Sequence, residues 1–435
     1  MNRRATLVLL SLSLGCSAAS PRPAVAPRAV PAPAPTPQAA VLDGPSQPDS
    51  AVDGRLSLKA ALRSAQAHSP ELAAAALELQ AQAELQNVAG RLPDPEFSVG
   101  VEGLPFSTPR SGEEFLAGIS QPIPLNGRLA GQEDLANARL QALQVRRDRI
   151  AGQVEVQLRG AFATALSLQE AAEVQASRVA SAQFAEELAA ARVQAGDLTP
   201  DALGSILADR VQLARELRDL RARSAAARSE LFAMMGSRES AADLEASLDQ
   251  VLELPAFEAL ADRIEAIPAV TEAMAQARVA ELAADLAAAQ TVPLVNLDLF
   301  YRQRGDERDS FDLGLHFEVP LSGTTAAESR AARARASAAS QYGRLQLRES
   351  LVELRRRHTA VARALDLVNG YEQQLLPASA AALAIAEARL AAGDLSPVDV
   401  LPLRDHDARV RLARLDAWHR LLSAWAQLTP FLPGE

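Results

Sequence analysis

The chain has 435 residues, and its 48% apolar content is enough for a packed structure although only 4% of the residues are aromatic. Its formal net charge is −10 with no large basic face, so the composition argues against a nucleic-acid partner. A single cysteine excludes an internal disulfide framework.

The amino terminus has the pattern of a secretory signal. Two arginines precede an apolar run, 5–14, that is too short to span a membrane as a helix. Residues 12–16, LSLGC, resemble the bacterial lipobox, although Ser13 stands where leucine is usual. We therefore expect a signal peptide over 1–15 and lipid attachment at Cys16. The alternative is a plain secreted protein with an incidental cysteine.

A segment rich in alanine and proline follows the cysteine. Such sequence cannot bury a core, so residues 16–55 are predicted to form the lipidated N-terminus and an extended tether. Beyond the signal, no run of about 20 apolar residues occurs, so a membrane crossing by this chain would have to use strands.

The rest of the sequence repeats itself. GDLTP at 196–200 returns as GDLSP at 393–397. GISQPIPLNG at 118–127 aligns in the same order with GLHFEVPLSG at 314–323. Similar offsets that persist along the chain indicate a duplicated unit rather than a chance match.

The duplication defines two units, 56–250 and 257–430. Each is predicted to contain an opening helix of about 30 residues, a hairpin of two strands and a very long helix. The opening helices are expected at 56–90 and 257–290, and the long helices at 128–195 and 324–392.

Alternation of apolar and polar residues predicts the four strands. In the best example, Phe311, Leu313 and Leu315 share one face while Asp312 and His316 share the other. The other predicted strands cover 97–102, 114–121 and 295–302. Six of the eleven phenylalanines fall in these two regions (Phe97, Phe106, Phe115, Phe300, Phe311 and Phe317). This distribution favours strands with a lipid-facing side.

A helix of about 68 residues would extend roughly 100 Å, which indicates a coiled coil or a tunnel wall rather than a globular element. Gly196 and Gly393 suit the left-handed position just past a helix end. Thr199 and Ser396 suit the N-cap of the next helix, with a proline in its first turn. GDL[TS]P is therefore predicted to be a tight joint between two long antiparallel helices.

Together these residues resemble the TolC family of outer membrane efflux proteins, and most closely its lipoprotein members for heavy-metal and drug efflux. The motifs that carry the resemblance are LPDPE at 92–96, GISQPIPLNGR at 118–128 and the glycine-centred joint, all occurring in order. The resemblance covers the chain after residue 55, including its duplication.

The resemblance implies a mainly α fold with a membrane β-barrel. Three copies would form a homotrimer with a twelve-stranded barrel in the outer membrane lipid and an α-helical barrel in the periplasm. The connections at 107–113 and 304–310 would face outside. The implied function is an exit duct that passively conducts small solutes such as drugs or metal cations, with no enzymatic activity and no cofactor. The implied partners are a periplasmic adaptor (membrane fusion) protein and an inner membrane RND-type transporter.

The resemblance also assigns the joints to the periplasmic tip. The expected adaptor contacts are Gly196, Asp197, Leu198, Thr199, Gly393, Asp394, Leu395 and Ser396. Asp399 matches an aspartate that lines the periplasmic aperture, where threefold symmetry would make a carboxylate ring. Asp201 lies one position off the corresponding place. Pro402 stands where some members have a second acid. The alternative for Asp399 is a helix N-terminal acid stabilised by the helix dipole.

Two other functions remain open at this point. The chain could be the exit duct of a type I protein secretion system, or a periplasmic coiled-coil scaffold without a pore, tethered by Cys16. The sequence shows no metal-binding or nucleophile motif. The segment 404–407, RDHD, is predicted to be a solvated charged face because adjacent helical residues point in different directions.

Overall fold

The fold is given by a computed structural model, which describes residues 55–102, 114–237, 243–245, 253–304 and 308–432. The first repeat comprises β1 (Arg55–Ser57), α1 (Leu58–His68), α2 (Pro70–Val88), β2 (Glu96–Glu102), β3 (Glu114–Ile123), α3 (Arg128–Ala195), α4 (Pro200–Met234) and β4 (Asp243–Glu245). The second comprises α5 (Phe257–Ala261), a 3₁₀ turn (Ile264–Ala266), α6 (Pro268–Ala289), β5 (Leu294–Arg304), β6 (Ser310–Glu318), α7 (Thr324–Gly370), a π turn (Tyr371–Leu375), α8 (Leu376–Ala391), α9 (Pro397–Leu428) and a last 3₁₀ turn (Thr429–Phe431).

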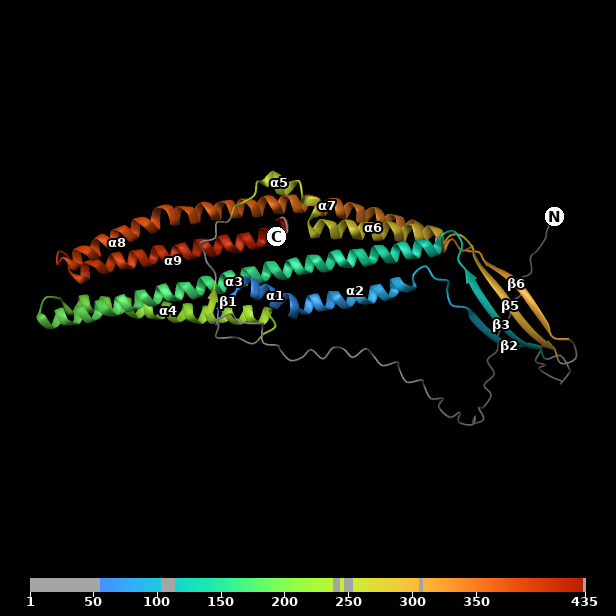
Figure 1. The fold of residues 1–435 in the computed structure, drawn as a ribbon, viewed down its shortest axis with the longest axis horizontal. Helices are drawn as coiled ribbons and strands as arrows, with labels where there is room; N and C mark the ends of the chain where they lie inside the picture. The colour runs from blue at the N-terminus through green and yellow to red at the C-terminus, as the bar shows by residue number, and fades with distance from the viewer. Residues whose placement is uncertain (1–54, 103–113, 238–242, 246–252, 305–307, 433–435) are drawn as a thin grey trace, which may run out of the picture. The chain divides into compact units, whose positions relative to one another are not determined.

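The four predicted strands form one antiparallel sheet in the order β2-β3-β5-β6 (Figure 1). β3 pairs with β5 and thereby joins the hairpins of the two repeats, with Gly118 opposite Phe300. The prediction of two hairpins is confirmed. A second sheet, the parallel pair β1-β4, has only three residues in each strand and was too short for the sequence pattern to indicate.

The helices pack side by side in two overlapping sets (Figure 1). Next to the sheet, the order of packing is α2-α3-α6-α7. Farther from the sheet, α3 continues and the order becomes α4-α3-α9-α8. α3 has 68 residues and is the one helix that belongs to both sets, so it connects them.

The main core lies where the two sets overlap. Its largest fully buried side chains include Leu158 of α3, Phe232 of α4, Leu354 of α7 and Leu421 of α9. Each of these helices contributes one apolar stripe, so none of them would bury its stripe alone. The core therefore holds the two repeats together at mid-length.

The prediction of single opening helices is wrong. Pro70 starts α2 at the first helical position, and Ser69 adopts the extended conformation of an N-cap, with its hydroxyl accepting from the N–H of Leu72 at 3.3 Å. Pro268 starts α6 in the same way after a 3₁₀ turn. A proline favours the first turn of a helix because its missing N–H is not needed there.

The prediction of a very long helical stretch over 324–392 is confirmed, but the stretch contains one irregularity. A π turn, Tyr371–Leu375, separates α7 from α8, and Pro377 follows it at the start of α8. A π turn accommodates one extra residue in a helix. The span between left-handed Gly323 and Gly393 is one residue longer than that between Gly127 and Gly196, so the π turn absorbs the insertion that separates the repeats.

Candidate functional site

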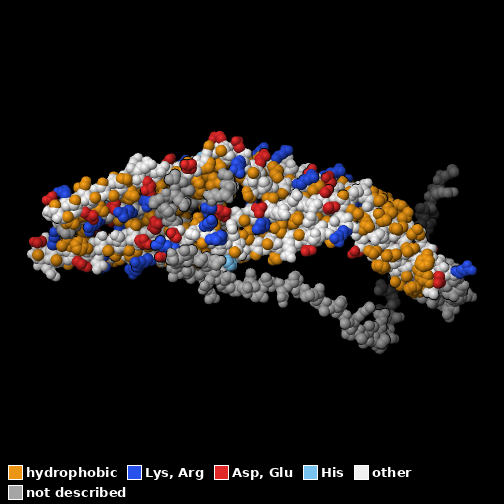
Figure 2. All heavy atoms as spheres, viewed as in Figure 1, with side chains coloured by type: hydrophobic (Ala, Val, Ile, Leu, Met, Phe, Trp, Pro, Cys, Tyr) orange, Lys and Arg blue, Asp and Glu red, His pale blue; other side chains and the backbone are white. Residues whose placement is uncertain are grey.

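One face of the four-stranded sheet is apolar across all four strands. The register aligns Phe97, Ile119, Leu299 and Leu313 in one row. Phe97 is 78% exposed and Leu313 75% exposed. Figure 2 shows hydrophobic side chains gathered over the strands, while charged side chains of both signs are spread over the helices. A contiguous apolar surface of this kind marks a lipid or protein contact.

The opposite face of the sheet is largely polar. Arg302 lies on this face and binds Glu114 at 2.7 Å and Asp312 at 3.2 Å. Ser120 donates a hydrogen bond to Asp298 from the neighbouring strand. The sheet is therefore two-sided, as alternation of strand residues requires.

Phe300 is an exception on the polar face. Its ring lies over Gly118, where an added Cβ would come within 2.3 Å of the ring. Gly118 is therefore required by close approach rather than by backbone torsion. The aromatic content of the strands was interpreted as lipid-facing, and Phe300 does not follow that interpretation because its register places it beside Asp312. Phe106 lies outside the described residues.

The two edges of the sheet are open. Among the described residues, β2 pairs only with β3, and β6 pairs only with β5. Edge strands present a row of unpaired backbone N–H and C=O groups that can pair with another chain. The apolar face is thus suited to contact with lipid or protein, and the open edges to pairing with another chain.

The two GDL[TS]P joints have the same geometry. Gly196 and Gly393 have φ of 82° and 83°, and each ends a Schellman motif. In the first joint, Asp197 donates its N–H to the carbonyl of Arg192 at 2.9 Å. In the second, Asp394 donates to the carbonyl of Arg389 at the same distance. In both joints, the carbonyl groups left without a partner at the helix end thereby accept hydrogen bonds from the same turn.

The side chains of the joints differ in exposure. Leu198, Leu395 and Ser396 are half-buried, whereas Asp197, Thr199 and Asp394 are exposed. The assignment of these residues as adaptor contacts stays a prediction.

Asp399 lies at the third position of α9 and is exposed. Its Oδ2 accepts hydrogen bonds from the backbone N–H of Ser396 at 3.0 Å and from the Ser396 hydroxyl at 2.8 Å. These two bonds, with the nearby charge of Arg192, hold the pKa of the Asp399 carboxyl below its usual range. The helix-capping role is thus present, and a capping aspartate can also face a pore. Asp201 is exposed in the first turn of α4.

The sequence did not indicate a partly buried polar network between helices. Arg178 of α3 binds Asp405 of α9 at 2.7 Å, and it donates to Gln175, which is 1% exposed. Gln175 in turn donates to Glu216 of α4 at 3.1 Å. The network ties three helices together beside a groove of about 800 Å³ between α3/α4 and α8/α9. Residues 227 positions apart carry no local sequence signal of such contact.

The prediction of a solvated charged face over 404–407 is wrong for Asp407. Its carboxylate is 4% exposed, accepts from Ser379 at 2.9 Å and binds Arg411 at 2.7 Å. In the part of the chain that the structure describes, no three His, Cys, Asp or Glu side chains are grouped as metal ligands would be.

Several predicted features lie outside the described residues: Cys16, the tether, the connection at 107–113 and the centre of the connection at 304–310. Of the helices that the structure describes, none is both long enough and apolar enough to cross a membrane.

Comparison with solved structures identifies the fold. No protein-family model matches the sequence, and no curated protein is similar to it in sequence. The outer-membrane channel OprN superposes with a TM-score of 0.71 at 17% identity, covering 86% of this chain and 89% of that one. CusC gives 0.71 at 16% identity over 87% and 92% of the two chains. The outer membrane protein VceC from Vibrio cholerae gives 0.69 at 18% identity over 86% and 95%.

Proposed function

We propose that this chain, which has the fold of the TolC-like outer-membrane channels, is an exit duct of the outer membrane. Three copies form a homotrimer that conducts small solutes passively from the periplasm to the outside. The chain carries out no bond chemistry and uses no cofactor.

The observation that carries the proposal is the two-sided sheet with open edges. In lipid, every backbone polar group must be paired within protein, so an open four-stranded sheet cannot span a bilayer alone. Three such sheets joined edge to edge give twelve strands and remove all the open edges. Closure places the apolar face toward lipid and the Arg302 face toward an aqueous lumen.

The helical part then continues the duct into the periplasm. α3 extends roughly 100 Å at 1.5 Å per residue, so the joints lie far from the sheet. Exposed Asp197 and Asp394, with half-buried Leu198 and Leu395, give the tip a surface that a periplasmic adaptor protein can contact. An inner membrane RND-type transporter is proposed to supply the energy.

Asp399 is proposed to line the aperture at this tip. The bonds from Ser396 engage only Oδ2 and fix the position of the carboxylate without burying it. Three such carboxylates would favour cations and repel anions. Cargo such as drugs or metal cations is consistent with an electronegative aperture, although selectivity for one compound would belong to the pump.

Membrane extraction of the full chain and of Cys16→Ser tests this proposal. A spanning barrel predicts that both proteins stay in the outer membrane fraction after alkaline washing and dissolve only in detergent. A scaffold held by its lipid anchor predicts that Cys16→Ser is released into the soluble fraction, and this result would exclude the duct. A search of neighbouring genes for an ATP-driven exporter tests the secretion alternative.

A further inference from the structure

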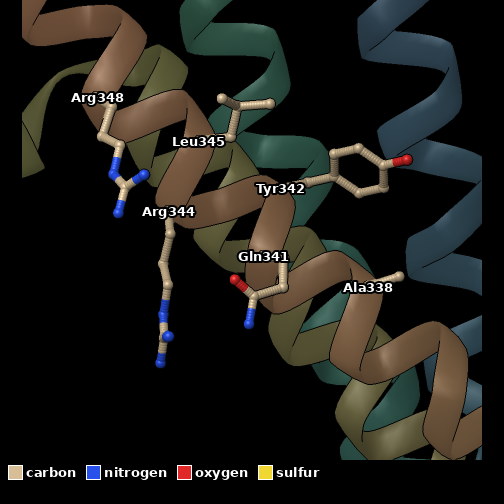
Figure 3. Close-up of a pocket in the computed structure, with 6 residues that line it drawn as sticks. All are labelled: Ala338, Gln341, Tyr342, Arg344, Leu345 and Arg348. Atoms are coloured by element: carbon tan, nitrogen blue, oxygen red, sulfur yellow. The ribbon is translucent and has the colours of Figure 1, made fainter.

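The exposed flank of α7 carries a shallow pocket of about 510 Å³. Its lining residues are Ala338, Gln341, Tyr342, Arg344, Leu345 and Arg348 (Figure 3). All six belong to α7, and Figure 3 shows Arg344 and Arg348 on one side of the helix with Tyr342 on the other. A pocket with walls from a single helix is half of a packing site, and α7 is the last helix of the set α2-α3-α6-α7.

The first helix of that set has an unpartnered apolar flank of its own. α2 buries only Ala75, and its Leu77, Leu85 and Val88 are 65%, 60% and 54% exposed. Large apolar side chains in a row along one helix normally pack against another helix. The two outer helices of the set therefore present a row of exposed apolar side chains on α2 and a pocket on α7.

The duplication shows how these two flanks would meet. α3 and α7 are equivalent helices, since each follows a left-handed glycine, Gly127 and Gly323. α2 and α6 are equivalent because each begins with a proline, Pro70 and Pro268. The contact of α3 with α6 inside one chain is therefore the template for a contact of α7 with α2 of the next chain.

The register of the template can be transferred residue by residue. Within the chain, Arg149 of α3 binds Glu272 of α6. The equivalent positions are Leu345 of α7 and Ala74 of α2. Because the helices run antiparallel, moving three residues along α2 to Leu77 corresponds to moving back about one turn on α7 from Leu345. The transferred register therefore places Leu77 at the middle of the pocket, beside Gln341 and Tyr342.

We propose that the α7 pocket is the seat of Leu77 from the α2 helix of a second copy, and that this contact sets the register between neighbouring chains. The inference rests on the proposed trimer and adds the residues that align it. It also predicts a difference in chemistry between the two kinds of seam. Inside the chain, Arg149 forms an ion pair and Arg128 donates to the carbonyls of Ala289 and Gln290. The equivalents, Leu345 and Thr324, carry no guanidinium, so these two interactions are missing from the contact between copies.

Cysteine cross-linking tests the register. The full chain is expressed with Cys16, its only cysteine, replaced by serine. Leu77→Cys is combined with Gln341→Cys, and the membranes are oxidised and run on non-reducing gels. The matched control combines Leu77→Cys with Val352→Cys, because Val352 is 71% exposed on the same flank but lies 11 residues farther along α7, roughly 16 Å away. Disulfides form only where Cα atoms come within about 7 Å.

The expected result is dimer and trimer bands for the Leu77/Gln341 pair and none for the control pair or either single variant. Cross-linking of the control pair, or no cross-linking of the Leu77/Gln341 pair, would overturn the register. The mass of the unmodified protein in detergent separates the two levels: a trimer without the cross-link removes only this inference, whereas a monomer removes the proposed function as well.

Discussion

Placing an arginine on the apolar face of the sheet should prevent insertion, whereas the same change one residue away should not. Leu315 is 61% exposed in β6, and the next residue, His316, points to the opposite face. An arginine on the lipid side of a barrel costs about 2–4 kcal/mol near the bilayer midplane. At 1.36 kcal/mol per factor of ten, Leu315→Arg should shift the folding equilibrium in lipid by roughly 30- to 1,000-fold.

The assay is urea titration of folding into phospholipid vesicles, followed by the mobility of the unheated protein on gels. His316→Arg is the matched control, since a lumen-facing arginine keeps its hydration and should change folding by less than about 0.5 kcal/mol. If the sheet instead lay in water, Leu315→Arg would replace an exposed leucine and would be as mild as the control. Equal midpoints for the two variants would refute the lipid-facing assignment.

Three further predictions follow from single residues. Gly196→Ala and Gly393→Ala should each destabilise the helical part by about 1–2 kcal/mol in thermal unfolding, because an added Cβ meets no neighbouring atom and only the positive φ opposes it. The control, Gly204→Ala inside α4, should stabilise the protein instead. A joint variant more stable than Gly204→Ala would contradict the joint geometry. Gly118→Ala should impair sheet formation because its Cβ would overlap the Phe300 ring. Phe300→Ala in the same chain should restore the yield of heat-modifiable protein, and failure of the rescue would mean that the Phe300 ring is not the obstacle. Asp399→Asn should lower cation selectivity. In the unmodified protein, the selectivity should survive as the pH falls through about 4, because the lowered pKa of Asp399 keeps its carboxylate charged until lower pH. Loss of selectivity between about pH 5 and 4 would mean that another acid sets it.

The predictable parts of this fold are those with a local signal. Alternation over nine residues fixed β6, since Phe311 and Leu313 had to share a face. Both joints were recognised because glycine, a hydroxyl residue and proline each have a separate reason to stand at a helix end. The duplication strengthened every assignment by showing it twice.

What was missed depends on contacts between distant residues or on small irregularities. Arg178 and Asp405 read as surface charges until α3 and α9 are placed together. Asp407 is buried because α8 supplies Ser379 opposite it, which no spacing within α9 indicates. The π turn accommodates a one-residue excess in the second repeat, and the spacing between the glycines does not show where along the helix that residue is absorbed.

The polar face of the sheet shows the same limit. Phe300 was counted among the aromatics that favour a lipid-facing side, and the strand register shows instead that it lies on the polar face, where Gly118 makes room for its ring. A glycine within a strand often marks close approach of another group, and the identity of that group depends on pairing between the two repeats.

The central claim is that three copies of this chain enclose a continuous water-filled path. Single-channel recording of the purified protein in a planar bilayer tests it most directly, with trimer mass in detergent measured on the same preparation. The account predicts a trimer with discrete conductance steps and a preference for cations that falls in Asp399→Asn. A monomer in detergent that produces no conductance steps would contradict the duct.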